Sequence, residues 1–321
     1  MKQHVNRNSV ISLLVMVMAA MSGRPVFAGE GNVSASYLYT LSNFTGVYAV
    51  SWGGVAVDEA ANEIYVALGG KGIKIFNDTG MEIYSFNDEM ELGNVNKVAV
   101  DDEGNIIALS WREKGFDLIR CNYRGEPVSK IELKNVPAAF AGFRSPTDII
   151  FRNGSIYLVD EVSMMVVVTD REGTFKDGYD LASLLGLTEQ KRADTGLGGF
   201  NVDREGDLLF TISAMAKAYI VSPDGTVRSF GKGGSTPGSF GVPGGIVADI
   251  SGNYILVADI LRCRILVFGK DLKFCTEFGY RGLSPDALIG PLGLAVDSRN
   301  RLYVTQLRDR GVSVYQIATG G

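Results

Sequence analysis

The sequence predicts an all-β fold, a six-bladed β-propeller of four-stranded antiparallel blades, and three observations lead to this prediction. A unit of small and aliphatic residues recurs six times, and its first strand closes at Asp58, Asp101, Phe151, Asp203, Asp249 and Asp297. Successive copies are 43 to 52 residues apart, a period typical of propeller blades or solenoids. Each complete copy holds four apolar segments, the number of strands in a propeller blade.

The first complete copy shows how the four strands follow one another. Residues 55–58 form a short first strand, and residues 64–67 form a more apolar second strand. Residues 72–76 and 81–86 are joined by residues 77–80, Asn-Asp-Thr-Gly, which favour a tight hairpin turn. The order predicts an antiparallel blade.

The two ends of the chain are predicted to share the last blade. After Asp297 the sixth copy offers only residues 302–305 and 312–317, so it lacks an outer strand. Residues 37–41, Tyr-Leu-Tyr-Thr-Leu, have a strand pattern and precede the first complete blade. An N-terminal strand that completes the last blade would close the ring and leave no open edge there.

The connection between the third and fourth copies is predicted to contain a short helix. Residues 180–192 carry four leucines in a pattern compatible with one helical face. This helix would pack over the ring near Asp148, either as a lid on the channel or as cover for a gap, and cover is the simpler expectation.

Two connections between copies resemble each other and a known repeat. Residues 230–249 and 278–297 both begin with Phe-Gly and reach the next strand through Pro-x-Gly. Together with residues 259–268 they resemble the NHL-repeat signature, which the fifth copy matches well and the third and fourth weakly. The resemblance covers residues 31–321 and implies a six-bladed propeller, a fold that hosts many unrelated functions.

The N-terminus is predicted to be a secretory signal peptide, residues 1–28. Lys2 and Arg7 precede the apolar run 10–21, and Val-Phe-Ala at 26–28 is a small-residue cleavage site. The alternative is a membrane anchor, but the run is short of the roughly 20 residues that span a bilayer. We therefore expect an exported protein, periplasmic or extracellular, with residues 29–321 as one propeller domain and no membrane insertion after cleavage.

Charge and cysteine content exclude two classes of ligand. Removing residues 1–28 takes away three of 31 basic residues and none of 36 acidic ones, which leaves a net charge of −8. Such a chain lacks the basic balance that nucleic-acid binding needs. Covalent haem is excluded because no Cys-x-x-Cys-His occurs. If Phe268 pairs with Lys273, Cys275 faces Leu266 and not Cys263, so three buried free thiols, with Cys121, are expected.

The histidine content limits the chemistry. His4 is the one histidine of the chain and lies in the predicted signal peptide. Serine–histidine and cysteine–histidine nucleophile pairs and histidine metal ligation are therefore excluded from the exported protein. What remains is carboxylate chemistry, with Ca²⁺ or Mg²⁺ held by Asp, Glu and Asn oxygens near the channel mouth, as in gluconolactonase-like propellers.

The repeat separates architectural acids from exceptions. Five of the six closing residues are Asp, and an Asp there can cap the turn that follows. Asp160 and Asp259 close second strands at matching positions, near the face where ligands could enter, and are also expected to be structural. Asp148 is an exception, because other copies have Val55, Val98, Phe200, Ile246 and Leu294 at its place.

Lys97 and Asn201 are further exceptions on innermost strands. With Asp148 they are the candidate channel-lining residues, from three consecutive blades. They either form a site or bond to one another and to water in a wet channel.

Basic and aromatic residues in the loops between second and third strands suggest a binding face. Its candidates are Trp111, Arg112, Asp160, Asp259, Arg262, Arg308 and Arg310. Arginine and aromatic side chains are typical interface anchors, although a merely solvated rim fits the pattern equally well.

Two functions follow from these patterns. The first is a binding scaffold for a protein or carbohydrate partner, with no cofactor. The second is a histidine-free, divalent-metal-assisted hydrolase or lactonase centred near Asp148; the sequence identifies no set of metal ligands for it.

Overall fold

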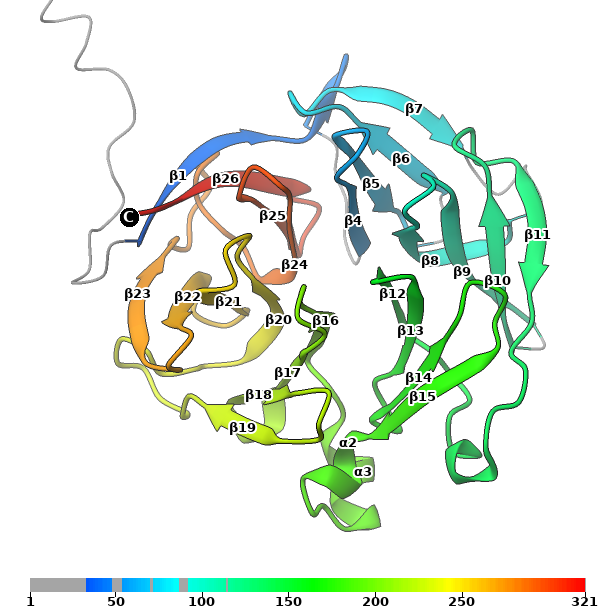
Figure 1. Ribbon diagram of the computed structural model, residues 1–321. Coiled ribbons are helices and arrows are strands. Elements are labelled where there is room, and N and C mark those ends of the chain that lie inside the picture. The colour runs from blue at the N-terminus through cyan, green and yellow to red at the C-terminus, as the bar shows by residue number, and fades with distance from the viewer. Residues whose placement is uncertain (1–32, 48–53, 70–71, 87–91, 114, 321) are drawn as a thin grey trace, which may run out of the picture.

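The computed structural model describes residues 33–47, 54–69, 72–86, 92–113 and 115–320. Six four-stranded antiparallel sheets stand in a ring around a central axis, with the innermost strand of each sheet at the centre (Figure 1). This arrangement confirms the predicted six-bladed β-propeller. The predicted signal peptide, residues 1–28, lies outside the described residues.

Each blade runs from its innermost strand outward. Blade one is β4 (Gly54–Asp58), β5 (Glu63–Ala67), β6 (Ile73–Phe76) and β7 (Glu82–Phe86). Blade two is β8 (Asn94–Val100), β9 (Ile106–Arg112), β10 (Gly115–Cys121) and β11 (Pro127–Ile131). Blade three is β12 (Asp148–Arg152), β13 (Ser155–Asp160), β14 (Met165–Thr169) and β15 (Phe175–Asp180).

The second half of the ring repeats this order. Blade four is β16 (Gly199–Val202), β17 (Leu208–Ile212), β18 (Lys217–Val221) and β19 (Val227–Phe230). Blade five is β20 (Pro243–Ala248), β21 (Tyr254–Asp259), β22 (Arg264–Gly269) and β23 (Phe274–Phe278). Blade six is β24 (Pro291–Val296), β25 (Arg301–Gln306), β26 (Val312–Thr319) and β1 (Val33–Thr40). A two-stranded hairpin, β2 (Ser42–Asn43) and β3 (Gly46–Val47), precedes blade one.

The N-terminal strand completes blade six, as the sequence predicts. β1 pairs antiparallel with β26, with Val33 opposite Thr319 and Thr40 opposite Ser313. Figure 1 shows β1 running along the outside of β26 toward blade one. The strand begins four residues before the predicted Tyr37, because Val33 and Ala35 are buried against blades five and six.

A buried arginine fastens this closure. The Arg301 side chain, 7% exposed, donates through Nε to Asp297 (2.6 Å). Its Nη1 donates to the carbonyl of Asp78 in blade one (2.5 Å) and to the hydroxyl of Tyr39 in β1 (3.2 Å). One guanidinium therefore joins blade six, the N-terminal strand and blade one.

The recurring aspartates cap turns, as expected. In each of the five, a carboxylate oxygen accepts a hydrogen bond from the amide two residues later, at 2.8 to 3.2 Å. An Asp side chain satisfies turn amides that the sheet leaves without a partner. These acids are therefore part of the blade architecture.

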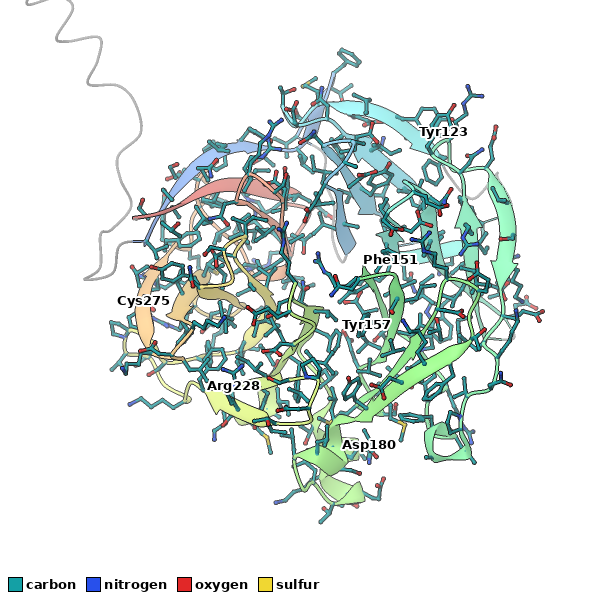
Figure 2. All side chains as sticks on the ribbon, in the orientation of Figure 1. Tyr123, Phe151, Tyr157, Asp180, Arg228 and Cys275 are labelled. Atoms are coloured by element: carbon teal, nitrogen blue, oxygen red, sulfur yellow. The ribbon has the colours of Figure 1, made fainter. Side chains whose placement is uncertain are left out.

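The connection from blade three to blade four holds two short helices, α2 (Leu181–Leu184) and α3 (Glu189–Thr195). Asp180 caps α2 by accepting from the amide of Ser183 (3.0 Å), and Arg192 binds the same carboxylate (2.8 Å). Leu181 is buried in the apolar cluster between the two blades. Figures 1 and 2 show the helices and Asp180 at the outer edge of the ring, so the helices act as cover between blades. No helix in the described part of the chain is long and apolar enough to cross a membrane.

The three cysteines are free thiols, but two details of the prediction are wrong. Cys275, on the outer strand β23 (Figure 2), is half-buried. Phe268 pairs with Phe274 and not with Lys273, because a bulge interrupts the register at Cys275. Cys121 is buried, and burial raises the pKa of its thiol to about 12, so it remains protonated.

Candidate functional site

A central cavity of about 760 Å³ is lined by the innermost strands of all six blades. One end opens where these strands begin. This end belongs to the connection-bearing face, which we define as the face with the inter-blade connections and the loops between second and third strands. The other end lies at the turns that follow the innermost strands. The two ends carry different polar groups.

Two of the predicted channel residues form an ion pair near the connection-bearing face. Lys97 Nζ lies 3.2 Å from Asp148 Oδ2, and their side chains keep 29% and 16% exposure, which faces the cavity. Asn201 lines the same cavity, but its side-chain oxygen accepts from the amide of Val202 (2.8 Å). Within the described residues, no hydrogen bond joins Asn201 to the pair.

A third charged residue, Glu161, was missed by the sequence reasoning. It follows the end of β13, lines the cavity, and donates its amide to Thr147 Oγ1 (3.3 Å). Its carboxylate acts electrostatically on both Lys97 and Asp148. The repeat could have indicated Glu161, because the residue directly after the second strand is apolar in blades one, five and six, where it is Leu68, Ile260 and Leu307.

The charged groups of this cluster change the pKa values of Lys97 and Glu161. Burial alone would lower the pKa of Lys97, but the carboxylates of Asp148 and Glu161 outweigh it and raise that pKa, so the ammonium persists. Burial raises the pKa of the Glu161 carboxyl, and the Asp148 charge adds to this, against the lowering effect of Lys97. Two carboxyl groups therefore share one ammonium.

The opposite end of the cavity is crossed by an ion pair. Arg204 Nη2 lies 2.8 and 3.1 Å from the two carboxylate oxygens of Glu59. These residues belong to blades four and one, which are opposite one another in a ring of six. Arg152 lies nearby, after Phe151 on the innermost strand of blade three (Figure 2), and burial lowers the pKa of its guanidinium. The ion pair narrows this end.

The residues present do not fit the Ca²⁺ or Mg²⁺ site that the alternative function, a metal-assisted hydrolase or lactonase, would need. Hard cations need several converging oxygen ligands, and the described residues contain no group of three or more His, Cys, Asp or Glu side chains arranged to hold a metal ion. At the cluster near the connection-bearing face, the Lys97 ammonium already binds the Asp148 carboxylate.

Asp160 and Asp259 are buried and hold loops in place. Asp259 accepts from the amides of Gly241 (2.6 Å), Val242 (3.2 Å) and Arg262 (3.0 Å). Asp160 accepts in the same way from four amides, of Arg144, Ser145, Val162 and Ser163. These contacts are those of the structural role expected for both residues, and neither side chain is accessible to a partner.

Three other candidates of the binding face are also engaged within the chain. Arg262 points inward, to Glu277 (2.7 Å) and to the carbonyl of Ser239 (2.6 Å). Arg112 binds Asp117 (2.9 Å) and stays half-exposed. Trp111 is partly buried and packs on Phe116, with ring centroids 6.4 Å apart.

Arg308 is exposed and Arg310 is half-buried in the loop between the second and third strands of blade six, and neighbouring loops add residues that the sequence analysis did not single out. We call Leu261, Arg281, Leu283, Arg308 and Arg310 the arginine-leucine patch. Arg310 donates to the carbonyls of Leu283 (3.2 Å) and Ser284 (2.8 Å), and Arg281 donates to that of Leu261 (3.2 Å). Leu261 is 59% and Leu283 83% exposed. In the part of the chain that the structure describes, none of these three arginines lies within 4 Å of a carboxylate.

Comparisons with known proteins identify the fold. No family model matches the chain, and no curated protein matches its sequence. A solved protein of unknown function from Bacteroides thetaiotaomicron matches with a TM-score of 0.65 at 12% identity, over 89% of this chain and 76% of that one. A streptogramin B lyase matches with 0.56 at 12%, over 90% and 98%.

A gluconolactonase from Xanthomonas campestris matches with a TM-score of 0.57 at 15% identity, over 94% of this chain and 96% of that one. Identities this low show the fold alone. The chain is a six-bladed β-propeller whose structural neighbours include propellers of the gluconolactonase and streptogramin lyase type.

Proposed function

We propose that this chain is an exported propeller of the NHL-repeat type that acts as a binding scaffold, and that its connection-bearing face engages a protein or carbohydrate partner. The observation that carries the proposal is the arginine-leucine patch. Its three guanidinium groups have no carboxylate partner among the described residues, and two large leucines stand exposed beside them.

The chemistry of the patch favours a protein partner with acidic and apolar side chains. Burying exposed leucines against a partner stabilises the complex by about 25 cal/mol per Å² of apolar surface removed from water. Arginines bind carboxylates in a bidentate manner and are enriched at interfaces. The chain as a whole has a net charge of −5, so this basic patch is a local feature and would orient an acidic partner.

The patch is also held in shape before binding. Arg281 and Arg310 already donate to backbone carbonyls of the neighbouring loops. A surface that is ordered in advance loses less side-chain entropy on association. Support for the alternative, a metal-assisted hydrolase or lactonase, is limited to the shared fold, because Asp148 is paired with Lys97.

A matched pair of charge-reversal variants tests the scaffold. The chain is immobilised, and exported proteins that crosslink to it are quantified at low and high salt. Arg281→Glu with Arg308→Glu is expected to reduce capture of the specific partner at least tenfold, since both anchors change sign. Arg124→Glu with Lys134→Glu carries the same change in net charge at exposed sites elsewhere on the molecule, and should retain capture. Equal capture by the two variants would exclude the patch as the binding surface.

A further inference from the structure

The central cavity contains a charged cluster that the scaffold function does not use. Lys97, Asp148 and Glu161 come from three places in the chain, namely the innermost strand of blade two, that of blade three, and the residue after β13. All three line the cavity near the connection-bearing face.

The cluster has an excess of negative charge. Asp148 holds the Lys97 ammonium at 3.2 Å, so that pair is neutral as a unit. Glu161 adds a second carboxyl group, and the hydrogen bonds of the described residues give its oxygens no basic partner of their own. A carboxylate enclosed in protein is stabilised by a nearby cation. Here the chain supplies one ammonium for two carboxyl groups.

The wall opposite the cluster has few polar side chains. Gly199 and Gly245 bring the innermost strands of blades four to six close together, because a Cβ at either position would meet backbone oxygen at 2.6 Å. The lining there consists of backbone groups and apolar residues such as Leu292. A ligand in this cavity therefore meets charge on one side and a less polar surface on the other.

The stem of Lys97 packs closely against blade one. A Cβ at Gly54 would lie 2.5 Å from Lys97 Cδ, so the lysine stem packs directly over the backbone of blade one. From this position the ammonium contacts Asp148.

We propose that the cavity binds a small organic compound with a primary ammonium group, which pairs with Glu161 while Asp148 remains neutralised by Lys97. The ammonium supplies the missing positive charge, and the body of the ligand lies against the glycine-lined wall. A volume of about 760 Å³ is ample for a molecule the size of an amino sugar. The site is independent of the arginine-leucine patch.

Calorimetric titration of the purified chain with three matched sugars tests this assignment. D-glucosamine carries an ammonium group where D-glucose carries a hydroxyl, and D-glucuronate carries a carboxylate. At pH 6 we expect D-glucosamine to bind at least tenfold more tightly than D-glucose and D-glucuronate not to bind. Equal binding of D-glucosamine and D-glucose, tighter binding of D-glucuronate to Lys97, or no binding of any of the three would overturn the proposal.

Two variants locate the site. Glu161→Gln preserves shape and removes the charge, and it should weaken D-glucosamine binding at least tenfold while the weak D-glucose signal stays the same. Glu113→Gln is the control, since Glu113 is an exposed glutamate that directly follows the second strand of blade two and does not line the cavity. If Glu161→Gln folds, as circular dichroism will show, and still binds D-glucosamine like the wild type, the assignment is wrong.

Discussion

Arg301 offers the sharpest test of how the ring is closed. Replacing it with Met removes the ion pair to Asp297 and the hydrogen bonds to the Asp78 carbonyl and the Tyr39 hydroxyl. The Asp297 side chain is only 5% exposed, so its carboxylate would be left buried and without a counter-charge. Removing one partner of a buried ion pair costs about 3–5 kcal/mol of folding free energy.

The same turn supplies the control. Arg299 binds the Asp78 carboxylate at 2.7 Å, but its side chain is 51% exposed. Exposed ion pairs contribute about 0–1 kcal/mol. Arg299→Met and Arg301→Met therefore remove the same residue type two positions apart. Only Arg301→Met should lower the free energy of unfolding substantially.

Urea unfolding followed by circular dichroism measures both variants. We expect Arg301→Met to lower the free energy of unfolding by about 3–5 kcal/mol, which corresponds to a fall in Tm of roughly 6–10 °C at about 2 °C per kcal/mol for a large domain. Equal losses in the two variants, or a loss below about 1 kcal/mol for Arg301→Met, would refute the claim that this guanidinium fastens the ring.

Two further predictions concern acids in different settings. The pKa of Glu161 is raised on folding, so its ionisation destabilises the folded state as the pH rises above 4.5. Glu161→Gln should therefore raise Tm at pH 7, and the gain should shrink as the pH falls through the raised pKa of the folded state and vanish below 4.5. Asp259→Ala should cost about 3 kcal/mol or more in urea unfolding, because three backbone amides lose their acceptor. Asp271→Ala, at an exposed turn, should change little, and a similar loss there would contradict this account.

The fold could be predicted because the repeat displays the same residue types at the same structural places. An Asp at the end of an innermost strand caps a turn in five blades, and that single geometry fixes the period. The closing strand could be predicted from the missing fourth segment of the last copy. Its true start at Val33 could not, since that depends on burial against blade five.

The site was predicted only in part. Lys97 and Asp148 stood out as exceptions on innermost strands, and the structure brings them into contact. Glu161 was not predicted, because it follows an architectural Asp and the residue after the second strand was not compared between blades. Arg262 looked like an exposed anchor, but whether a loop arginine turns outward depends on a partner such as Glu277, which lies on another strand of the blade.

The sixth blade forms only when both β1 and β26 are present. Five blades are each built from one continuous stretch of chain, whereas β1 and β26 come from opposite ends of the described sequence. Contacts between such distant segments form late, because the loop between them must close first. A truncated chain that lacks one of the two strands could form individual blades but not the closed ring. The cavity that the ring encloses would then not form. Any ligand of the cavity would thus distinguish finished molecules from partial ones.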